Sequence, residues 1–184
     1  QVDTLLDSIK ADDSGITFVG YASGFERQGA ADAEKLEEAV ALAKKADTVL
    51  LCLGLDELRE SEGLDRSDMK LAENQQQLLA AVAAVNPNVV VLLSAGAPVE
   101  TPWVGQCRAL VYGALGGQAG AGAAADILTG KLCPCGKLSQ TWAQAHDDTP
   151  AKANFGGEGR NVEYREGLYV GCLLYTSPSP RDRT

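Results

Sequence analysis

Two glutamates, an aspartate and an arginine crowd into one short polar segment, Glu60-Ser61-Glu62-Gly63-Leu64-Asp65-Arg66. It follows directly after residues 48–54, a continuous apolar run typical of a strand buried on both faces of a parallel sheet. Ligands of such sheets bind beyond the carboxyl ends of the strands. A carboxylate there, beside a glycine that permits close backbone approach, is a candidate for general acid/base chemistry. A solvated acidic loop without a catalytic role fits the same spacing.

Strands and helices are predicted to alternate along the chain that must position this segment. We expect helices at residues 4–10, 31–45, 74–85 and 118–128, and strands at 16–20, 48–54, 89–94, 108–112 and 137–142. Leu36 and Val40, for example, recur at helical spacing among charged residues. The alternation predicts an α/β fold, with a mostly parallel sheet, right-handed crossovers and helices on both faces in flavodoxin-like layers.

Composition limits the possible partners. The chain has 184 residues, of which 45% are apolar and 22% charged, as expected for one soluble globular domain. Its net charge of −9 argues against binding to a nucleic-acid backbone or an anionic membrane. No apolar run approaches the roughly 18 residues that a membrane-spanning helix needs. We therefore expect no nucleic-acid and no membrane partner.

Cysteine and glycine patterns argue against a metal or a cofactor. Cys52 falls in the middle of a predicted strand and is interpreted as a small buried hydrophobe. Cys133 and Cys135 have no second pair, and His146 is the single histidine, so a tetrahedral zinc site would lack ligands. The glycine-rich residues 115–122 lack the lysine of a phosphate-binding loop and do not follow the first strand. We predict no metal, no nucleotide and no other cofactor.

Residues 60–66 resemble the E-x-E-G-Y-D-R segment of the C-terminal α/β domain of family 3 glycoside hydrolases, with Leu64 in place of tyrosine. The similarity continues in order through residues 86–103, which end in P-V-x-x-P-W, and through 134–138 and 164–171. On this resemblance residues 1–171 are identified as such a domain, incomplete at its N-terminal side. Residues 172–184 depart from the family pattern, and we expect them to be a disordered, non-native tail.

The resemblance implies a retaining, exo-acting β-glycosidase, with β-glucosidase as the leading specificity and β-xylosidase next. Its substrate would be a β-glucoside or an oligosaccharide with a terminal β-linked sugar. Retention needs two carboxyl groups about 5–5.5 Å apart. The family's nucleophilic aspartate lies on an N-terminal barrel domain, which this chain lacks, so we expect the chain alone to be inactive.

Residue by residue, the same resemblance assigns the acid/base role to Glu62, with Glu60 as the alternative. Gly63, Asp65 and Arg66 are expected to support the loop, the last two through a mutual ion pair.

A second hypothesis needs no catalysis. A stand-alone α/β binding module would use Asp56, Glu57 and Glu62 as ligand or metal contacts at the strand ends. The hydrolase hypothesis instead predicts apolar surface near the Glu62 loop, left uncovered by the missing barrel. Tyr112, Trp103 and Trp142 are interpreted as core or interdomain packing residues rather than platforms for sugar stacking.

Overall fold

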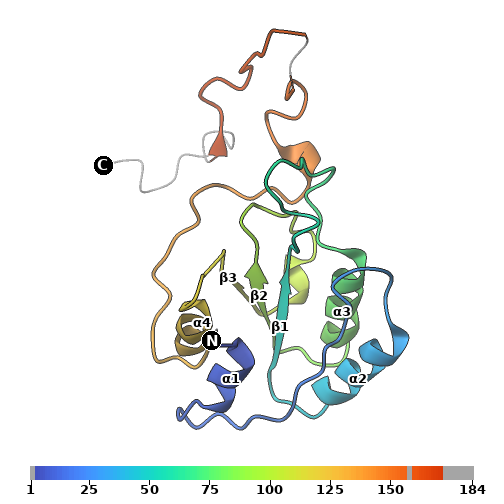
Figure 1. Ribbon diagram of the computed structural model, residues 1–184, viewed down its shortest axis with the longest axis vertical. Helices are drawn as coiled ribbons and strands as arrows, with labels where there is room; N and C mark the ends of the chain where they lie inside the picture. The colour runs from blue at the N-terminus through green and yellow to red at the C-terminus, as the bar shows by residue number, and fades with distance from the viewer. Residues whose placement is uncertain (1–2, 157–158, 172–184) are drawn as a thin grey trace.

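The computed structural model describes residues 3–156 and 159–171. Its elements are α1 (Leu5–Lys10), α2 (Ala33–Ala43), β1 (Val49–Gly54), α3 (Glu73–Ala83), β2 (Val89–Ser94), β3 (Ala109–Tyr112) and α4 (Gly120–Leu128), with short 3-10 turns η1 (Val104–Gln106) and η2 (His146–Asp148). The three strands of the described part are parallel, in the order β1-β2-β3. Figure 1 shows α2 and α3 on one side of this sheet and α1 and α4 on the other. The predicted α/β fold is confirmed.

Local sequence signals set the helix boundaries. The side chain of Asp32 caps α2 by accepting hydrogen bonds from the amides of Glu34 and Lys35, at 3.0 and 3.2 Å. Asn86, three residues beyond α3, donates through its side-chain nitrogen to the carbonyls of Ala43 and Ala46. Asn86 is 5% exposed, so its buried amide is satisfied by joining the ends of α2 and α3.

One face of the sheet carries the core. The alternate residues of β1 and β2 that point to this face pack with apolar residues of α3. The buried members from these three elements are Leu51, Leu53, Leu78, Leu79, Val82, Val89, Val91 and Leu93. Trp103 joins the same cluster at 3% exposure, and Tyr112 and Trp142 pack edge to face with ring centroids 4.8 Å apart. These aromatic residues therefore serve packing, as interpreted from the sequence.

β1 is the edge strand of the described sheet, and its uncovered face corrects two predictions. Leu51 and Leu53 are buried, whereas Cys52 between them is exposed. The prediction of burial on both faces was wrong because the face of the sheet that carries Cys52 is covered over β2 but not over β1: Leu92, the β2 partner of Cys52, is only 7% exposed. Cys52 is therefore not a buried hydrophobe. β2, with partners on both sides, is the strand buried most fully.

Two predicted strands are absent from the described structure. Residues 16–20 form no ladder; the chain here passes over the helices, because Gly20 lies against Leu42 of α2 and Gly24 against Leu78 of α3. Residues 137–142 also remain unpaired. Leu138 there is 53% exposed, so this segment has too little buried apolar surface to hold an edge strand.

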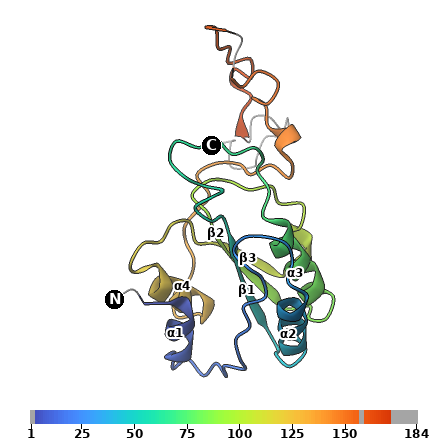
Figure 2. The same cartoon turned by 45° about the vertical axis from the view of Figure 1, so that its right-hand side comes forward.

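The chain beyond α4 runs mostly over the surface. Residues 131–156 and 159–171 contain η2 as their one named helix or strand; in Figures 1 and 2 the chain after α4 first runs up beside the sheet and then rises above it. Their large apolar side chains are exposed, with Phe155 at 88% and Tyr164 at 81%. None of the helices in the described part is long and apolar enough to cross a membrane. The predicted tail, residues 172–184, lies outside the described residues.

Candidate active site

The candidate site begins where β1 ends. Val49 and Leu55 donate backbone hydrogen bonds toward β2, to Asn88 and Ser94, so the alternate residue Gly54 presents its amide and carbonyl to the open edge. Both groups are paired by the side chain of Gln75 on α3, at 2.9 Å each. Gly54 is required sterically as well, since a Cβ there would lie 2.1 Å from the carbonyl oxygen of Ser94. The end of the strand that delivers the acidic segment is thus fixed from two sides.

A capped turn links this strand to Glu60. The Asp56 side chain accepts from the amides of Leu58 and Arg59, at 3.1 and 3.0 Å. The Asp56 carbonyl accepts from the amide of Glu60 at 2.9 Å. The turn reverses the chain immediately beyond the sheet, and Figure 1 shows the following loop at the same end of the sheet as the loop after β2.

Glu62 lies at the tip of the next turn, formed by Ser61 to Leu64. The Leu64 amide donates to the Ser61 carbonyl at 3.3 Å, and the two residues form an isolated antiparallel bridge. Gly63 has a φ of +77°, the backbone conformation that the third residue of a type II turn requires. Glu62 is exposed, and within the described part its carboxylate accepts no hydrogen bond. We call residues 61–64 the Glu62 turn.

Glu60, the alternative acid/base candidate, is already engaged. One of its carboxylate oxygens accepts a hydrogen bond from the amide of Gly96, in the loop after β2, at 2.8 Å. Its side chain is half-buried. A Cβ at Gly96 would lie 2.9 Å from a Glu60 carboxylate oxygen and 3.0 Å from the Leu115 side chain. The geometry gives Glu60 a structural partner and leaves Glu62 free for solvent or a ligand.

Arg66 holds the other side of the turn, but not in the way predicted. Its Nη1 donates to the carbonyl of Pro98 at 3.0 Å, while Asp65 is exposed. The predicted ion pair between Asp65 and Arg66 is not formed between these two described residues. The Arg66 guanidinium reaches the loop after β2 instead, where its buried Nη2 has no described partner.

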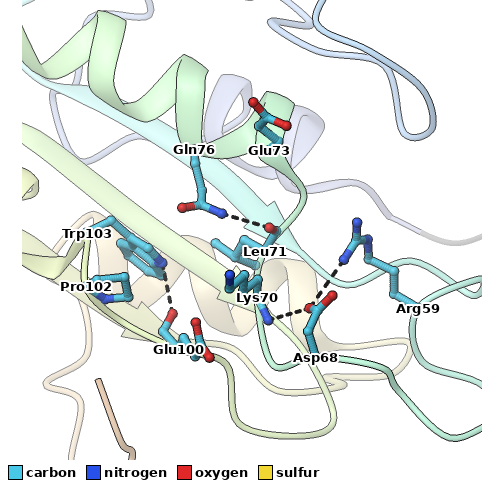
Figure 3. Close-up of a pocket in the computed structure, with 9 residues that line it drawn as sticks. All are labelled: Arg59, Asp68, Lys70, Leu71, Glu73, Gln76, Glu100, Pro102 and Trp103. Carbon is cyan, nitrogen blue, oxygen red and sulfur yellow. Dashed lines mark hydrogen bonds and ion pairs between the residues drawn. The ribbon is translucent and has the colours of Figure 1, made fainter. Parts of the chain in front are cut away.

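A cavity of about 480 Å³ lies beside the segment, lined in part by Arg59, Asp68 and Trp103. Figure 3 shows Arg59 directed toward Asp68, with Trp103 on the opposite side of the cavity. The Arg59 and Asp68 side chains are 3.8 Å apart. Glu100, which also lines it, is 8% exposed and accepts from the amide of His146 at 2.9 Å. Glu62 does not line this cavity, so the turn and the cavity are separate features.

Two of the three contacts expected for a binding module, Asp56 and Glu57, are used within the fold, and Glu62 is not. Asp56 caps its turn, as described above, and Glu57 pairs with Arg27. Within residues 3–156 and 159–171, no three His, Cys, Asp or Glu residues gather as potential metal ligands. Cys133 and Cys135 are free and exposed. The Cys107 thiol is partly buried, and this burial raises its pKa.

Comparison with known proteins identifies the domain. Residues 1–172 match the model of the glycosyl hydrolase family 3 C-terminal domain. The chain belongs to this family. It is 39% identical to thermostable beta-glucosidase B of Acetivibrio thermocellus over 95% of the chain, and 41% identical to an exo-alpha-(1->6)-L-arabinopyranosidase of Bifidobacterium breve, also over 95%. The predicted family resemblance is confirmed.

Solved structures give the same family. A family 3 β-glucosidase of Bifidobacterium adolescentis superimposes with a TM-score of 0.86 at 42% identity over 95% of this chain. A β-glucosidase of Kluyveromyces marxianus, solved with glucose, gives 0.73 at 39% identity over 80%. The chain spans 23% and 22% of the two curated relatives named above, and 26% and 18% of these two structures.

The sequence analysis did not predict three residues of the site: Gln75, Gly96 and Pro98. Gly96 and Pro98 follow a predicted strand at the same sheet edge as the acidic segment, so parallel topology was the available signal. The role of Gln75 depends on β1 being an edge strand, which its apolar sequence concealed.

Proposed function

We propose that this family 3 domain supplies the acid/base glutamate of a retaining, exo-acting β-glycosidase, with a β-glucoside as substrate, and that the glutamate is Glu62. One observation carries the assignment of the residue. Of the two candidates, Glu60 is held by the Gly96 amide, whereas the Glu62 carboxylate stands exposed at the tip of its turn. Curated relatives named as β-glucosidases support the substrate class.

In this mechanism Glu62 acts twice. It first donates its proton to the glycosidic oxygen while a second carboxylate attacks the anomeric carbon and the glycosidic bond breaks. It then takes a proton from the water that displaces the enzyme carboxylate from that carbon. Gly63 permits the turn that presents Glu62, and Arg66 ties the chain after the turn to the loop after β2.

The second carboxylate belongs to a barrel domain of the same polypeptide in this proposal. Three leucines around the candidate site support a docking partner there: Leu58, Leu64 and Leu115 are 63%, 64% and 73% exposed. Exposed apolar side chains of this size near a catalytic carboxylate fit a surface that another domain covers. The isolated chain is accordingly expected to hydrolyse no glycoside.

A domain exchange tests the assignment. Residues 3–171 replace the matching domain of the Bifidobacterium adolescentis β-glucosidase, and kcat/KM is measured with phenyl and 2,4-dinitrophenyl β-glucosides. Glu62→Gln is expected to lower kcat/KM for the phenyl glucoside by about 10²–10⁴-fold, because its leaving group requires protonation. The dinitrophenyl glucoside, whose leaving group needs no proton, should lose much less.

Two further results decide the proposal. Azide should restore turnover of the dinitrophenyl glucoside by Glu62→Gln, giving glucosyl azide, since this anion attacks without a general base. An active exchange enzyme that is unaffected by Glu62→Gln would refute the assignment. Asp65→Asn is the matched control: it removes a neighbouring exposed carboxylate and should leave the two substrates affected equally.

A further inference from the structure

We infer that Glu60 and Arg66 are positioning residues that hold the Glu62 turn through two anchoring contacts to a single loop, residues 95–98. This inference rests on the proposed function, because it concerns how Glu62 is aimed. Neither residue is required to touch the substrate. Each acts by fixing the backbone on one side of the turn that carries the acid/base carboxylate.

The two contacts lie on opposite sides of the turn. Before the turn, Glu60 accepts from the Gly96 amide at 2.8 Å; after it, Arg66 donates to the Pro98 carbonyl at 3.0 Å. The turn closes on itself through only one backbone hydrogen bond, from Leu64 to Ser61. Its orientation relative to the sheet therefore depends on contacts outside it.

The loop of residues 95–98, which both contacts reach, is itself fixed to the sheet. Ala95 is fully buried, and its carbonyl accepts a hydrogen bond from the Tyr112 hydroxyl at 2.7 Å. Val99 is also fully buried, and the adjacent Glu100 amide donates to the Met69 carbonyl at 2.7 Å. The anchoring contacts thus connect the Glu62 turn to the rigid core rather than to another exposed segment.

The charge of Glu60 and the space beside Gly96 both favour the hydrogen bond between the Glu60 carboxylate and the Gly96 amide. A carboxylate makes a stronger hydrogen bond to a backbone amide than a neutral acceptor does. Gly96 leaves room for it: an added Cβ would approach the Glu60 carboxylate to 2.9 Å. Gly96→Ala should displace the carboxylate while the backbone stays in place, because the crowded atoms belong to the ends of the Glu60 and Leu115 side chains.

Positioning has a distinct kinetic signature. A general acid must lie within hydrogen-bond reach of the oxygen that it protonates, and a displacement of about 1 Å costs roughly a hundredfold in rate. Loss of an anchoring contact should therefore slow substrates that need protonation more than substrates that do not. A general loss of folded enzyme would slow both equally.

The first test uses the full chain and needs no catalysis. The amide proton resonance of Gly96 is followed by NMR from acid to neutral pH in the wild type and in Glu60→Ala, with Glu62→Gln as control. An amide that donates to a carboxylate shifts when that carboxylate is protonated. The pH-dependent shift should persist in Glu62→Gln and vanish in Glu60→Ala; its persistence in Glu60→Ala would overturn the contact.

The second test uses the domain-exchange enzyme and the two glucosides. Glu60→Ala and Arg66→Met should each lower kcat/KM for the phenyl glucoside by about tenfold to a hundredfold, with less than a threefold effect on the dinitrophenyl glucoside. Glu60→Gln retains an acceptor for the Gly96 amide and should restore most of the activity. Rescue by glutamine also shows that Glu60 is not itself the proton donor.

The possible outcomes separate the two proposals. Equal losses on both substrates, or no loss in either variant, would refute the positioning role while leaving Glu62 as the acid/base residue. Full activity of Glu62→Gln would refute the proposed function, and the Gly96 resonance would still decide whether the Glu60 contact exists. Loss of phenyl glucoside turnover in Glu60→Gln, together with full activity of Glu62→Gln, would transfer the acid/base role to Glu60.

Discussion

Replacing Gln75 with alanine should destabilise the domain far more than its place near the start of α3 suggests. Its side-chain amide donates to the Gly54 carbonyl and accepts from the Gly54 amide, both at 2.9 Å, and the residue is 5% exposed. Two neutral hydrogen bonds contribute about 1–3 kcal/mol together, and leaving partly buried backbone groups unpaired adds to that. We expect the free energy of unfolding to fall by about 2–4 kcal/mol.

Urea unfolding of the chain, followed by circular dichroism, measures this loss. Gln77→Ala is the matched control, because Gln77 lies on the same helix, is exposed and bonds only to Glu73 one turn away. Its loss should stay within about 0.5 kcal/mol. If Gln75→Ala destabilises no more than Gln77→Ala, then the side chain does not hold the end of β1, and the reasoning is refuted.

Other predictions concern the same strand end and a distant ion-pair cluster. Gly54→Ala should cost about 3 kcal/mol in urea unfolding, because its Cβ would meet the backbone oxygen of Ser94 at 2.1 Å, which cannot rotate away. Hydrogen bonds from Lys131 hold the pKa values of Asp12 and Asp13 below the usual range. The ion pairs of Asp12 and Asp13 with Lys131 therefore stabilise the folded chain fully above about pH 4. This stabilisation is lost as the pH falls through the lowered pKa values of the two aspartates. The Tm difference between wild type and Lys131→Met should narrow at acid pH; a constant difference would contradict this account.

Sequence reasoning succeeded where local patterns decide the structure. The helical spacing of Leu36 and Val40 predicted α2, and the apolar runs predicted β1 and β2. It failed where pairing decides, as at residues 16–20, because whether an extended segment joins a sheet depends on which edge is free and what already covers it. β1 shows the same limit: its apolar sequence gives no sign that Cys52 faces solvent.

The candidate site, too, was predictable from the sequence only in part. Glu60, Glu62 and Gly63 share one segment, so their chemistry is visible in the sequence. The roles proposed for Glu60 and Glu62 are not visible there, because the proposal depends on the Gly96 amide, which lies 36 positions away from Glu60 along the chain. The predicted Asp65–Arg66 ion pair failed for a related reason. Adjacent opposite charges suggest a local pair, whereas the guanidinium is long enough to reach a carbonyl on the neighbouring loop.

Under the proposed function, the exposure of Glu62 means that this domain would need a partner for catalysis. A retaining mechanism needs a second carboxylate about 5–5.5 Å from the first, and water must be excluded while the glycosidic bond breaks. In the proposed mechanism the Glu62 turn supplies the acid/base carboxylate but does not enclose it, since Glu62 and Leu64 both face solvent. A docking domain would provide both missing parts at once, by covering the exposed leucines and by bringing the nucleophile. Anchoring the turn to the core beforehand, through Glu60 and Arg66, would then reduce the entropy lost when the two halves of the site meet.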